Sequence, residues 1–189
     1  MDKAHLRNLV KKQRTQLSPK ELQLISEKVM ANLEENFDFS KKITNLFLPI
    51  EKFHEIDLFP MIDLITAKGG EVCLNTADFS AQRLHTYLYE NKEQIKISPY
   101  GIPEPMYGAE VDVSKIDIII VPLLAFNDKG YRVGYGKGFY DNYLIRCSKK
   151  CVFIGVNHFN EMNEIEDIRA QDVPLHFIVT PKKIYTFPG

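Results

Sequence analysis

The sequence predicts an α/β protein: a single three-layer domain over residues 1–189, with helices flanking a largely parallel central sheet. Three observations lead to this class. Short strand-like apolar runs alternate with segments of helical periodicity along the chain. One run, KIDIIIV at residues 115–121, is typical of a central strand buried on both faces. A glycine-rich stretch follows that run, which is how α/β proteins commonly build phosphate sites.

The amino-acid composition indicates which classes of protein fit this chain. The chain is 44% hydrophobic and 26% charged, which suits a folded domain, and its net charge of -1 argues against a broad nucleic-acid footprint. Its three cysteines are irregularly spaced, so we expect free thiols rather than a disulfide framework or a zinc motif. The first residues lack the apolar core of a secretory signal, and no apolar run approaches the ~20 residues of a membrane span. We therefore expect a cytoplasmic protein.

The first element is expected to be a helix over residues 2–14. One side of this helix is apolar, and an adjacent arc carries four cations: Lys3, Arg7, Lys11 and Arg14. Like charges at this spacing destabilise a helix by a few tenths of a kcal/mol per pair. The arc is either a solvated basic face or a surface that meets phosphates.

Two further helices are expected in the first half of the chain. The second begins at Ser18, which forms a capping box with Glu21 around a proline at the first helical position. The third is expected to be capped by Asp57 and to end at the Gly69-Gly70 pair. We interpret the second helix as scaffold.

The remaining pattern predicts strands joined by loops. Strands are expected at residues 43–48, 71–74, 84–89, 115–121, 151–156 and 177–180, the last one ended by Pro181, with an extended segment at 99–105 and a helix at 138–146. Glu55 lies in the loop between the first strand and the third helix. Loops at strand ends of open α/β sheets bind ligands, so Glu55 is a candidate ligand residue, with a solvated loop glutamate as the alternative.

Four glycines lie close together after the central run: Gly130, Gly134, Gly136 and Gly138. Each glycine in a regular element costs about 0.5–1 kcal/mol relative to alanine, so the group indicates a sharp turn or a close backbone approach. Backbone N–H groups there suit an anion, and Arg132 and Lys137 suit phosphate oxygens. Asp141 would suit magnesium beside a phosphate. A glycine-rich turn with a helix-capping aspartate is the alternative.

Two common nucleotide motifs do not match this stretch. The dinucleotide fingerprint needs glycines directly after a strand, whereas about a dozen residues separate Val121 from Gly134. The Walker loop needs Gly-Lys followed by Ser or Thr, and the sequence contains no such run.

The stretch GYRVGYGKGFYDNYL, residues 130–144, resembles the signature of 5-formyltetrahydrofolate cyclo-ligases, also called methenyltetrahydrofolate synthetases. Individually weaker similarities to that family follow in order along nearly the whole chain, at residues 3–14, 47–57, 101–105, 117–122 and 171–180. The resemblance implies an enzyme that uses ATP and Mg²⁺ to convert 5-formyltetrahydrofolate into 5,10-methenyltetrahydrofolate, ADP and phosphate. Two alternatives are another ATP-dependent small-molecule kinase with the same glycine loop and a nucleic-acid-binding module, which the net charge disfavours.

The resemblance also implies residue roles. Lys137 and Arg132 would be catalytic, and Asp141 and Asp172 would be the magnesium carboxylates. ATP contacts are implied for Lys3, Ala4, His5, Leu6, Arg7, Arg132, Val133, Gly134, Tyr135, Gly136, Lys137, Gly138, Phe139 and Tyr140. Substrate contacts are implied for Ile50, Glu55, Tyr135, Gly136, Lys137, Gly138 and Phe139.

Three further residues are not given any of those roles. Arg14 is the weaker phosphate candidate of the basic arc, Lys11 is expected to be solvated, and His158 is expected to be a structural histidine. The expected partners are ATP and 5-formyltetrahydrofolate, with or without a polyglutamate tail. Neither nucleic acid nor a membrane is expected, and the chain is expected to be a monomer.

Overall fold

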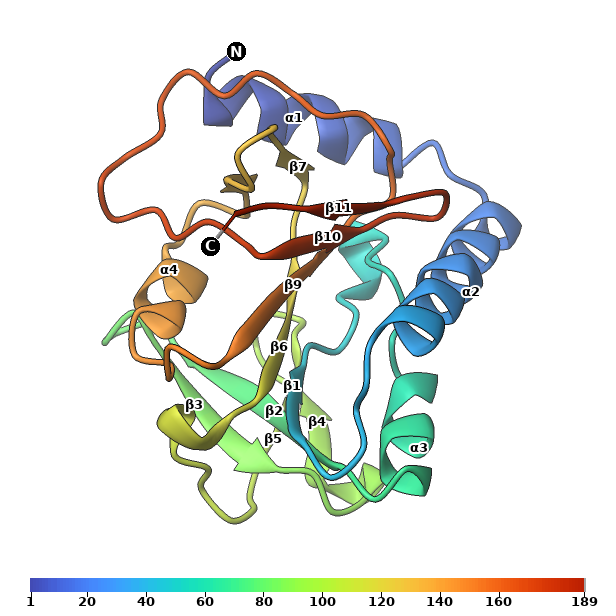
Figure 1. Ribbon diagram of the computed structural model, residues 1–189, viewed down its shortest axis with the longest axis vertical. Coiled ribbons are helices and arrows are strands. Elements are labelled where there is room, and N and C mark those ends of the chain that lie inside the picture. The colour runs from blue at the N-terminus through green and yellow to red at the C-terminus, as the bar shows by residue number, and fades with distance from the viewer. Residues whose placement is uncertain (189) are drawn as a thin grey trace.

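A seven-stranded sheet of order β11-β10-β9-β6-β1-β2-β3 forms the centre of the computed structural model, which describes residues 1–188 (Figure 1). Its strands are β1 (Ile43–Leu46), β2 (Glu71–Asp78), β3 (Arg83–Leu88), β6 (Ile118–Pro122), β9 (Val152–Val156), β10 (Phe177–Val179) and β11 (Ile184–Thr186). The five inner strands run parallel, and β3 and β11 pair antiparallel at the edges. The mostly parallel α/β sheet expected from the sequence is confirmed.

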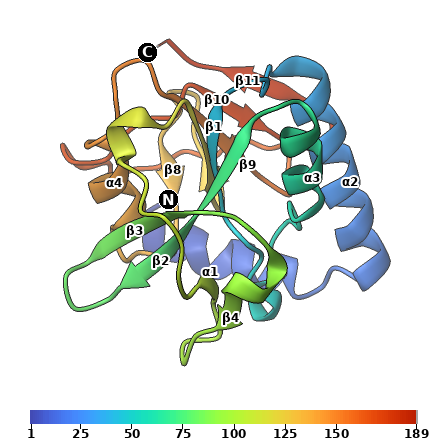
Figure 2. The same ribbon diagram turned by 90° about the horizontal axis from the view of Figure 1, so that it is seen from below.

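The helices form the outer layers. They are α1 (Lys3–Arg14), α2 (Pro19–Asn36), α3 (Pro60–Ala67) and α4 (Phe139–Leu144). Alternate residues of a strand point to opposite faces, so Ile118 and Ile120 of β6 pack with Ile65 of α3 in one buried cluster. Ile119 packs with Tyr143 of α4 in another. Figure 2 shows α2 and α3 on one side of the central sheet and α4 on the other.

The helix α1 lies across the end of the sheet rather than on either face (Figure 1). Its inward residues Leu6 and Val10 pack against Leu124, Ala125 and Val133, which belong to the segment after β6. Because the cations of the basic arc lie beside this apolar stripe, the packing turns several of them toward the carboxyl ends of the strands.

A small hairpin fills the gap between the central strand and the glycines. It consists of β7 (Ala125–Phe126) and β8 (Arg132–Val133), and its turn is held by Asn127, whose side-chain oxygen accepts from the N–H groups of Lys129 and Tyr131. Gly130 has φ +80°, and a Cβ there would meet the carbonyl oxygen of Leu175 at 2.6 Å. The hairpin accounts for the long spacing between the strand and the glycine loop.

The structure corrects several element boundaries. The sheet does not end at Pro181, because Thr180 and Lys183 close a tight turn by a backbone hydrogen bond of 3.0 Å and lead into β11. Proline at the second position of such a turn fits its fixed φ. Asp57 is not the cap of α3, since its carboxylate accepts from Phe59 N, a residue before the helix starts. The capping box of Ser18 and Glu21 is confirmed.

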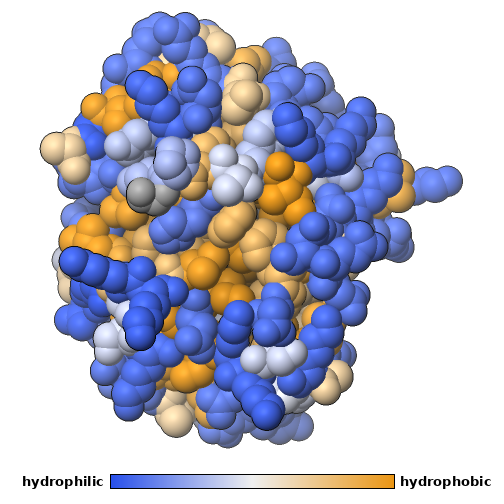
Figure 3. Space-filling view, viewed as in Figure 1, coloured by the Kyte–Doolittle hydropathy of each residue, from blue (hydrophilic) through white to orange (hydrophobic). Residues whose placement is uncertain are grey.

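Short elements complete the chain. They are β4 (Ile95–Ile97), β5 (Pro103–Pro105), and the 3₁₀ turns Glu51–Phe53, Lys92–Gln94 and Val113–Lys115. The strands β4 and β5 form an antiparallel hairpin below the main sheet. No helix within residues 1–188 is both long and apolar enough to cross a membrane. On the face seen in Figure 3, hydrophobic residues gather near the middle of the view and hydrophilic residues surround them.

Candidate active site

The strand order creates a place for a ligand between β1 and β6. The chain leaves β1 toward β2 on one side, and leaves β6 toward β9 on the other. In open α/β sheets, ligands bind outside the carboxyl ends of strands at such a topological switch point. A cavity of about 900 Å³ opens there, bordered by Phe47 after β1 and Pro122 at the end of β6. The first three cations of the basic arc of α1, the loop containing Glu55 and the glycine loop all reach it.

The glycine loop, residues 134–138, links β8 to α4 along one side of the cavity. Gly136 and Gly138 have φ +86° and +73°, a region that side chains other than glycine's rarely adopt. A Cβ on Gly136 would lie 3.1 Å from the guanidinium of Arg7, whose Nε donates to Gly134 O at 2.9 Å. Lys137 is exposed between the two glycines. Glycine is therefore required where the loop turns and where Arg7 approaches it.

Arg132 is anchored at the base of this loop. Its guanidinium is 8% exposed and donates to Val173 O at 2.6 Å and to the Asp141 carboxylate at 2.8 Å. Asp141 also accepts from Val173 N at 3.2 Å. Burial lowers the pKa of Arg132, and the Asp141 carboxylate opposes that shift. Arg132 thus ties the glycine loop to the C-terminal segment as well as bordering the cavity.

A second ion pair joins the two ends of the chain. The ammonium of Lys3 pairs with the carboxylate of Asp172, and both side chains are mostly buried. The Lys3 N–H donates to Asp167 at 2.8 Å, and Asp172 also accepts from Arg169 N at 2.7 Å. The loop before β10 is thereby held against the start of α1 (Figure 1). Asp172 reaches the same cavity as Asp141, although 31 residues separate them in sequence (172 − 141).

The donor set suits magnesium with a phosphate rather than a metal held by protein alone. Within residues 1–188, no three His, Cys, Asp or Glu side chains are grouped closely enough to hold a metal ion. Mg²⁺ is commonly bound through one or two carboxylates together with phosphate oxygens and water. Asp141 and Asp172, two of the three aspartates bordering the cavity, fit that pattern.

Glu55 lies at the other side of the cavity and is almost fully buried. The residue is 4% exposed. One carboxylate oxygen accepts from the Tyr135 hydroxyl at 2.5 Å, and the other accepts from Ile50 N at 2.8 Å. Burial raises the pKa of Glu55, while those two hydrogen bonds and the charge of Arg14 oppose the rise. Glu55 is a constrained acceptor rather than a solvated loop glutamate.

An aromatic wall stands beside Glu55. The rings of Phe53 and Tyr135 stack with centroids 5.0 Å apart, and the ammonium of Lys11 lies 5.3 Å and 5.4 Å from the two centroids. The expectation of a solvated Lys11 is therefore wrong: its burial and its neighbours Arg7 and Arg14 lower its pKa. A flat ring system and a cation at this wall suit a planar ligand.

Known proteins resemble this chain over most of its length. A family model described as the 5-formyltetrahydrofolate cyclo-ligase family matches residues 1–181 of the chain. The chain belongs to that family. A 5-formyltetrahydrofolate cyclo-ligase of Escherichia coli K12 is 31% identical over 135 residues, covering 69% of this chain and 74% of the relative. One of Mus musculus is 29% identical over 132 residues, covering 66% and 62%.

Solved structures agree with the family assignment. The 5,10-methenyltetrahydrofolate synthetase of Aquifex aeolicus superposes with a TM-score of 0.83 at 32% identity, covering all of this chain and 94% of that one. The synthetase of Mycoplasma pneumoniae shares the fold with a TM-score of 0.77 at 21% identity, over 96% of this chain and all of that one. The relatives carry the name of a ligase, so the chain belongs to a family of enzymes.

Most residues assigned from the family resemblance border the cavity. They are Lys3, Ala4, Arg7, Ile50, Glu55, Arg132, Gly134, Tyr135, Gly136, Lys137, Gly138, Phe139, Tyr140, Asp141 and Asp172. Three others do not. Leu6 and Val133 are fully buried in the core between α1 and the hairpin, and His5 is exposed on α1 away from the cavity lining. The structure thus separates helix residues that face the cavity from those that hold the helix in place.

Other cavity residues were given no role from the sequence. Phe79 packs on Tyr100 with centroids 4.1 Å apart and meets Phe139 edge-on at 5.1 Å. Glu104, 5% exposed, accepts from Ala77 N at 2.7 Å. These residues reach the cavity because the β2–β3 and β4–β5 hairpins fold toward it. Glu104 lies in the segment 101–105 that resembles the family, whereas Phe79 and Tyr100 lie in no such segment. His158 is buried with its Nε2 2.6 Å from His54 O, as expected of a structural histidine.

Proposed function

We propose that this chain converts 5-formyltetrahydrofolate into 5,10-methenyltetrahydrofolate, using ATP and Mg²⁺ and releasing ADP and phosphate. The observation that carries the proposal is a single cavity with two chemically distinct ends. One end offers Lys137 between Gly136 and Gly138, and the other offers the buried acceptor Glu55 beside an aromatic wall that includes Tyr135 of the same loop. A nucleotide and a folate could therefore be held side by side.

The chemistry explains why both ends are needed. A formamide carbon is a poor electrophile and its oxygen a poor leaving group. Transfer of the γ-phosphoryl group to the formyl oxygen makes that oxygen a good leaving group, and ADP departs. The neighbouring folate nitrogen then attacks the carbon and expels phosphate as the ring closes. Positioning and charge neutralisation are the main tasks left to the protein.

The residues at the loop end would perform the neutralisation. Lys137 stands exposed between two glycines, so its ammonium can follow the charge of the transferred phosphoryl group. Arg7 and Lys3 face the same space from α1. Arg132 would act on the phosphates from its anchored position and keep Asp141 oriented. Asp141 and Asp172 would hold Mg²⁺, which supplies charge neutralisation at the phosphate oxygens when bound.

The residues at the other end would orient the folate. Glu55 can accept two N–H bonds from the amide and amino edge of a pteridine, because each carboxylate oxygen has further lone pairs beyond the bond it already accepts. The rings of Phe53, Tyr135 and Phe139 offer flat surfaces for packing. Ile50 borders the cavity beside Glu55. We further propose that the enzyme is a cytoplasmic monomer.

The decisive experiment is to incubate the chain with Mg-ATP and 5-formyltetrahydrofolate and follow the methenyl absorbance together with ADP. Equal amounts of methenyl product and ADP are expected. ADP without the chromophore would point to a kinase acting on another acceptor. A chain that binds single-stranded nucleic acid with a steep salt dependence, and makes neither product, would point to a binding module.

A further inference from the structure

We propose that Arg14 is a positioning residue that acts through the Tyr135 hydroxyl to hold Glu55 as an ionised and oriented acceptor for the substrate. The inference rests on the proposed function, in which Glu55 binds the folate. Arg14 itself is absent from the lining of the large cavity. Its effect on a ligand must therefore pass through the side chains that do border it.

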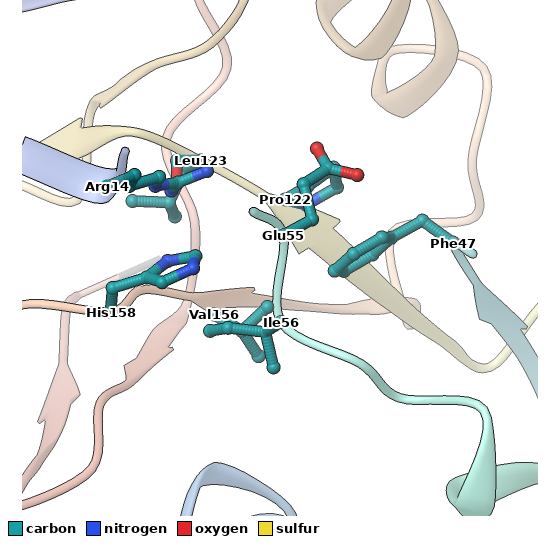
Figure 4. A pocket seen from close by; sticks show the side chains of 8 residues that line it. All are labelled: Arg14, Phe47, Glu55, Ile56, Pro122, Leu123, Val156 and His158. Carbon is teal, nitrogen blue, oxygen red and sulfur yellow. The ribbon is translucent and has the colours of Figure 1, made fainter. Parts of the chain in front are cut away.

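Arg14 is the last residue of α1 and is 2% exposed. Its guanidinium donates to the Tyr135 hydroxyl at 3.2 Å and also to the carbonyl oxygen of Leu123. Figure 4 shows Arg14 and Glu55 on opposite sides of a small pocket that Pro122 and Leu123 also line. The basic arc of α1 is thus divided: its first three cations border the large cavity, and the fourth lies behind Glu55.

The directions of the hydrogen bonds follow from the chemistry of the donors. A guanidinium can only donate, so the Tyr135 oxygen accepts from Arg14 and its own proton is directed to Glu55 Oε1 at 2.5 Å. The Ile50 N–H can also only donate, and it meets Oε2 at 2.8 Å. A proton on Oε1 would compete with Arg14 for the tyrosine oxygen. The network is complete when Glu55 is a carboxylate.

This arrangement works against the effect of burial. Burial raises the pKa of Glu55, and the Tyr135 and Ile50 hydrogen bonds and the Arg14 charge lower it. Burial and Arg14 hold the pKa of His158 well below its usual range, so its imidazole contributes no positive charge near neutrality. The charged and titratable groups around Glu55 are Arg14, Lys11, Tyr135, Tyr140, His54 and His158.

The stability of the fold gives one reason to place an arginine here, the hydrogen bond to the carbonyl oxygen of Leu123, and one reason against it. Within residues 1–188, the Nε of Arg14 is buried without a hydrogen-bond partner. An unsatisfied buried donor is unfavourable, and an apolar side chain would avoid it. The benefit of the guanidinium is the fixed proton on Tyr135 and the positive charge behind Glu55. Both favour a carboxylate that accepts, rather than donates, hydrogen bonds at the cavity.

The test compares Arg14→Met and Arg14→Lys with wild type, measuring the KM for each substrate and kcat between pH 5 and pH 8. Loss of a hydrogen-bonding charge should raise the folate KM of Arg14→Met about tenfold at pH 7, while kcat and the ATP KM change little. The pH below which the folate KM rises should move up by about one pH unit. Arg14→Lys keeps the charge and should recover part of both effects.

A second readout follows the carboxylate itself. The ¹³C signal of the Glu55 carboxyl should titrate at higher pH in Arg14→Met and in Tyr135→Phe than in wild type. Tyr135→Phe removes only the hydroxyl, so it carries the test if Arg14→Met does not fold. His54→Asn is the matched control, since it removes a nearby imidazole at a backbone position of φ 48° that asparagine tolerates. It should leave the titration unchanged.

The outcomes separate the inference from the proposed function. A wild-type chain that makes no methenyl product contradicts the proposed function, and the carboxyl titration still decides whether Arg14 controls Glu55. The inference is overturned if the wild-type chain turns over and both variants, Arg14→Met and Tyr135→Phe, behave like it. That means that they keep the wild-type rise of the folate KM at low pH and the wild-type titration of Glu55. Equal rises in the ATP and folate KM of an Arg14→Met variant that keeps the wild-type melting temperature would also overturn it, since Arg14 would then affect both ligands and not the folate through Glu55.

Discussion

The two ends of the cavity use charge in different ways. At the loop end, cations and carboxylates of opposite sign are paired with each other, as in Lys3 with Asp172 and Arg132 with Asp141, and Lys137 remains exposed. At the other end, a single carboxylate, Glu55, is buried and held by a tyrosine and a backbone N–H. The first end is suited to a ligand of high charge, and the second to a ligand recognised by its hydrogen-bond pattern.

The contrast has a physical consequence. Paired charges that border the cavity can exchange partners when phosphates and a cation arrive, because each phosphate can replace a carboxylate and the cation can replace a lysine. A buried carboxylate cannot exchange partners cheaply, so its geometry must be fixed before the ligand binds. Ligand binding at the loop end should therefore depend on salt and magnesium. Ligand binding at the Glu55 end should depend on single hydrogen bonds.

The largest effect is expected at Lys137. We expect Lys137→Ala to lose at least about 100-fold in kcat, because no other group stands at the centre of the glycine loop to neutralise the phosphoryl group. Its melting temperature should stay at the wild-type value, since the side chain is exposed. Lys150→Ala, an exposed lysine before β9 at the opposite end of the sheet, is the matched control. Wild-type turnover in Lys137→Ala would remove this residue from the mechanism.

Both aspartates should affect the magnesium requirement, and Asp141 should also affect the stability of the fold. Both Asp141→Asn and Asp172→Asn should raise the Mg²⁺ concentration needed for half-maximal rate by about tenfold or more, since each loses one charge toward the metal. Asp141→Asn should also lower the free energy of unfolding by about 3 kcal/mol, because it leaves the buried Arg132 without its charge partner. Denaturant unfolding and magnesium titrations of both variants measure this, and an unchanged magnesium requirement would count against the metal role.

A smaller effect should appear at Glu55. Glu55→Gln places an amide NH₂ against either the Ile50 N–H, which only donates, or the Tyr135 hydroxyl, whose proton points at residue 55 because its oxygen accepts from Arg14. The folate KM should rise about tenfold and the ATP KM much less. Steady-state kinetics with each substrate varied in turn give both values. The reverse pattern would mean that Glu55 faces the nucleotide.

The smallest effect should come from salt. Raising the ionic strength from 0.05 M to 0.3 M should raise the ATP KM several-fold, because screening weakens the attraction between the exposed Lys137 and the phosphates. The folate KM, governed by buried hydrogen bonds, should change less than twofold. Equal responses of the two constants would remove the distinction between the two ends.

Local features of the sequence predicted local features of the structure. The apolar run before Pro122 is the central strand, the Ser18 capping box starts α2, and the glycines at 136 and 138 adopt the positive φ that their grouping indicated. Each of these depends on residues within a few positions of one another, so it can be interpreted without a fold.

Features built from distant residues were not predictable in the same way. The pairing of Lys3 with Asp172 and the bond from Arg14 to Tyr135 join residues more than a hundred positions apart. Lys11 was expected in solvent because its aromatic partners come from two separate loops. The strand β11 was missed because Pro181 indicates a stop, and only the hydrogen bonds around Thr180 show that the proline turns the chain back.

The most direct test of the two-ended cavity is a crystal structure with a non-hydrolysable Mg-ATP analogue and 5-formyltetrahydrofolate bound together. We expect phosphate oxygens within hydrogen-bonding distance of the glycine loop and Lys137, and the pteridine edge in contact with Glu55. Phosphates on Glu55, a pteridine edge that does not contact Glu55, or both ligands outside this cavity would contradict it.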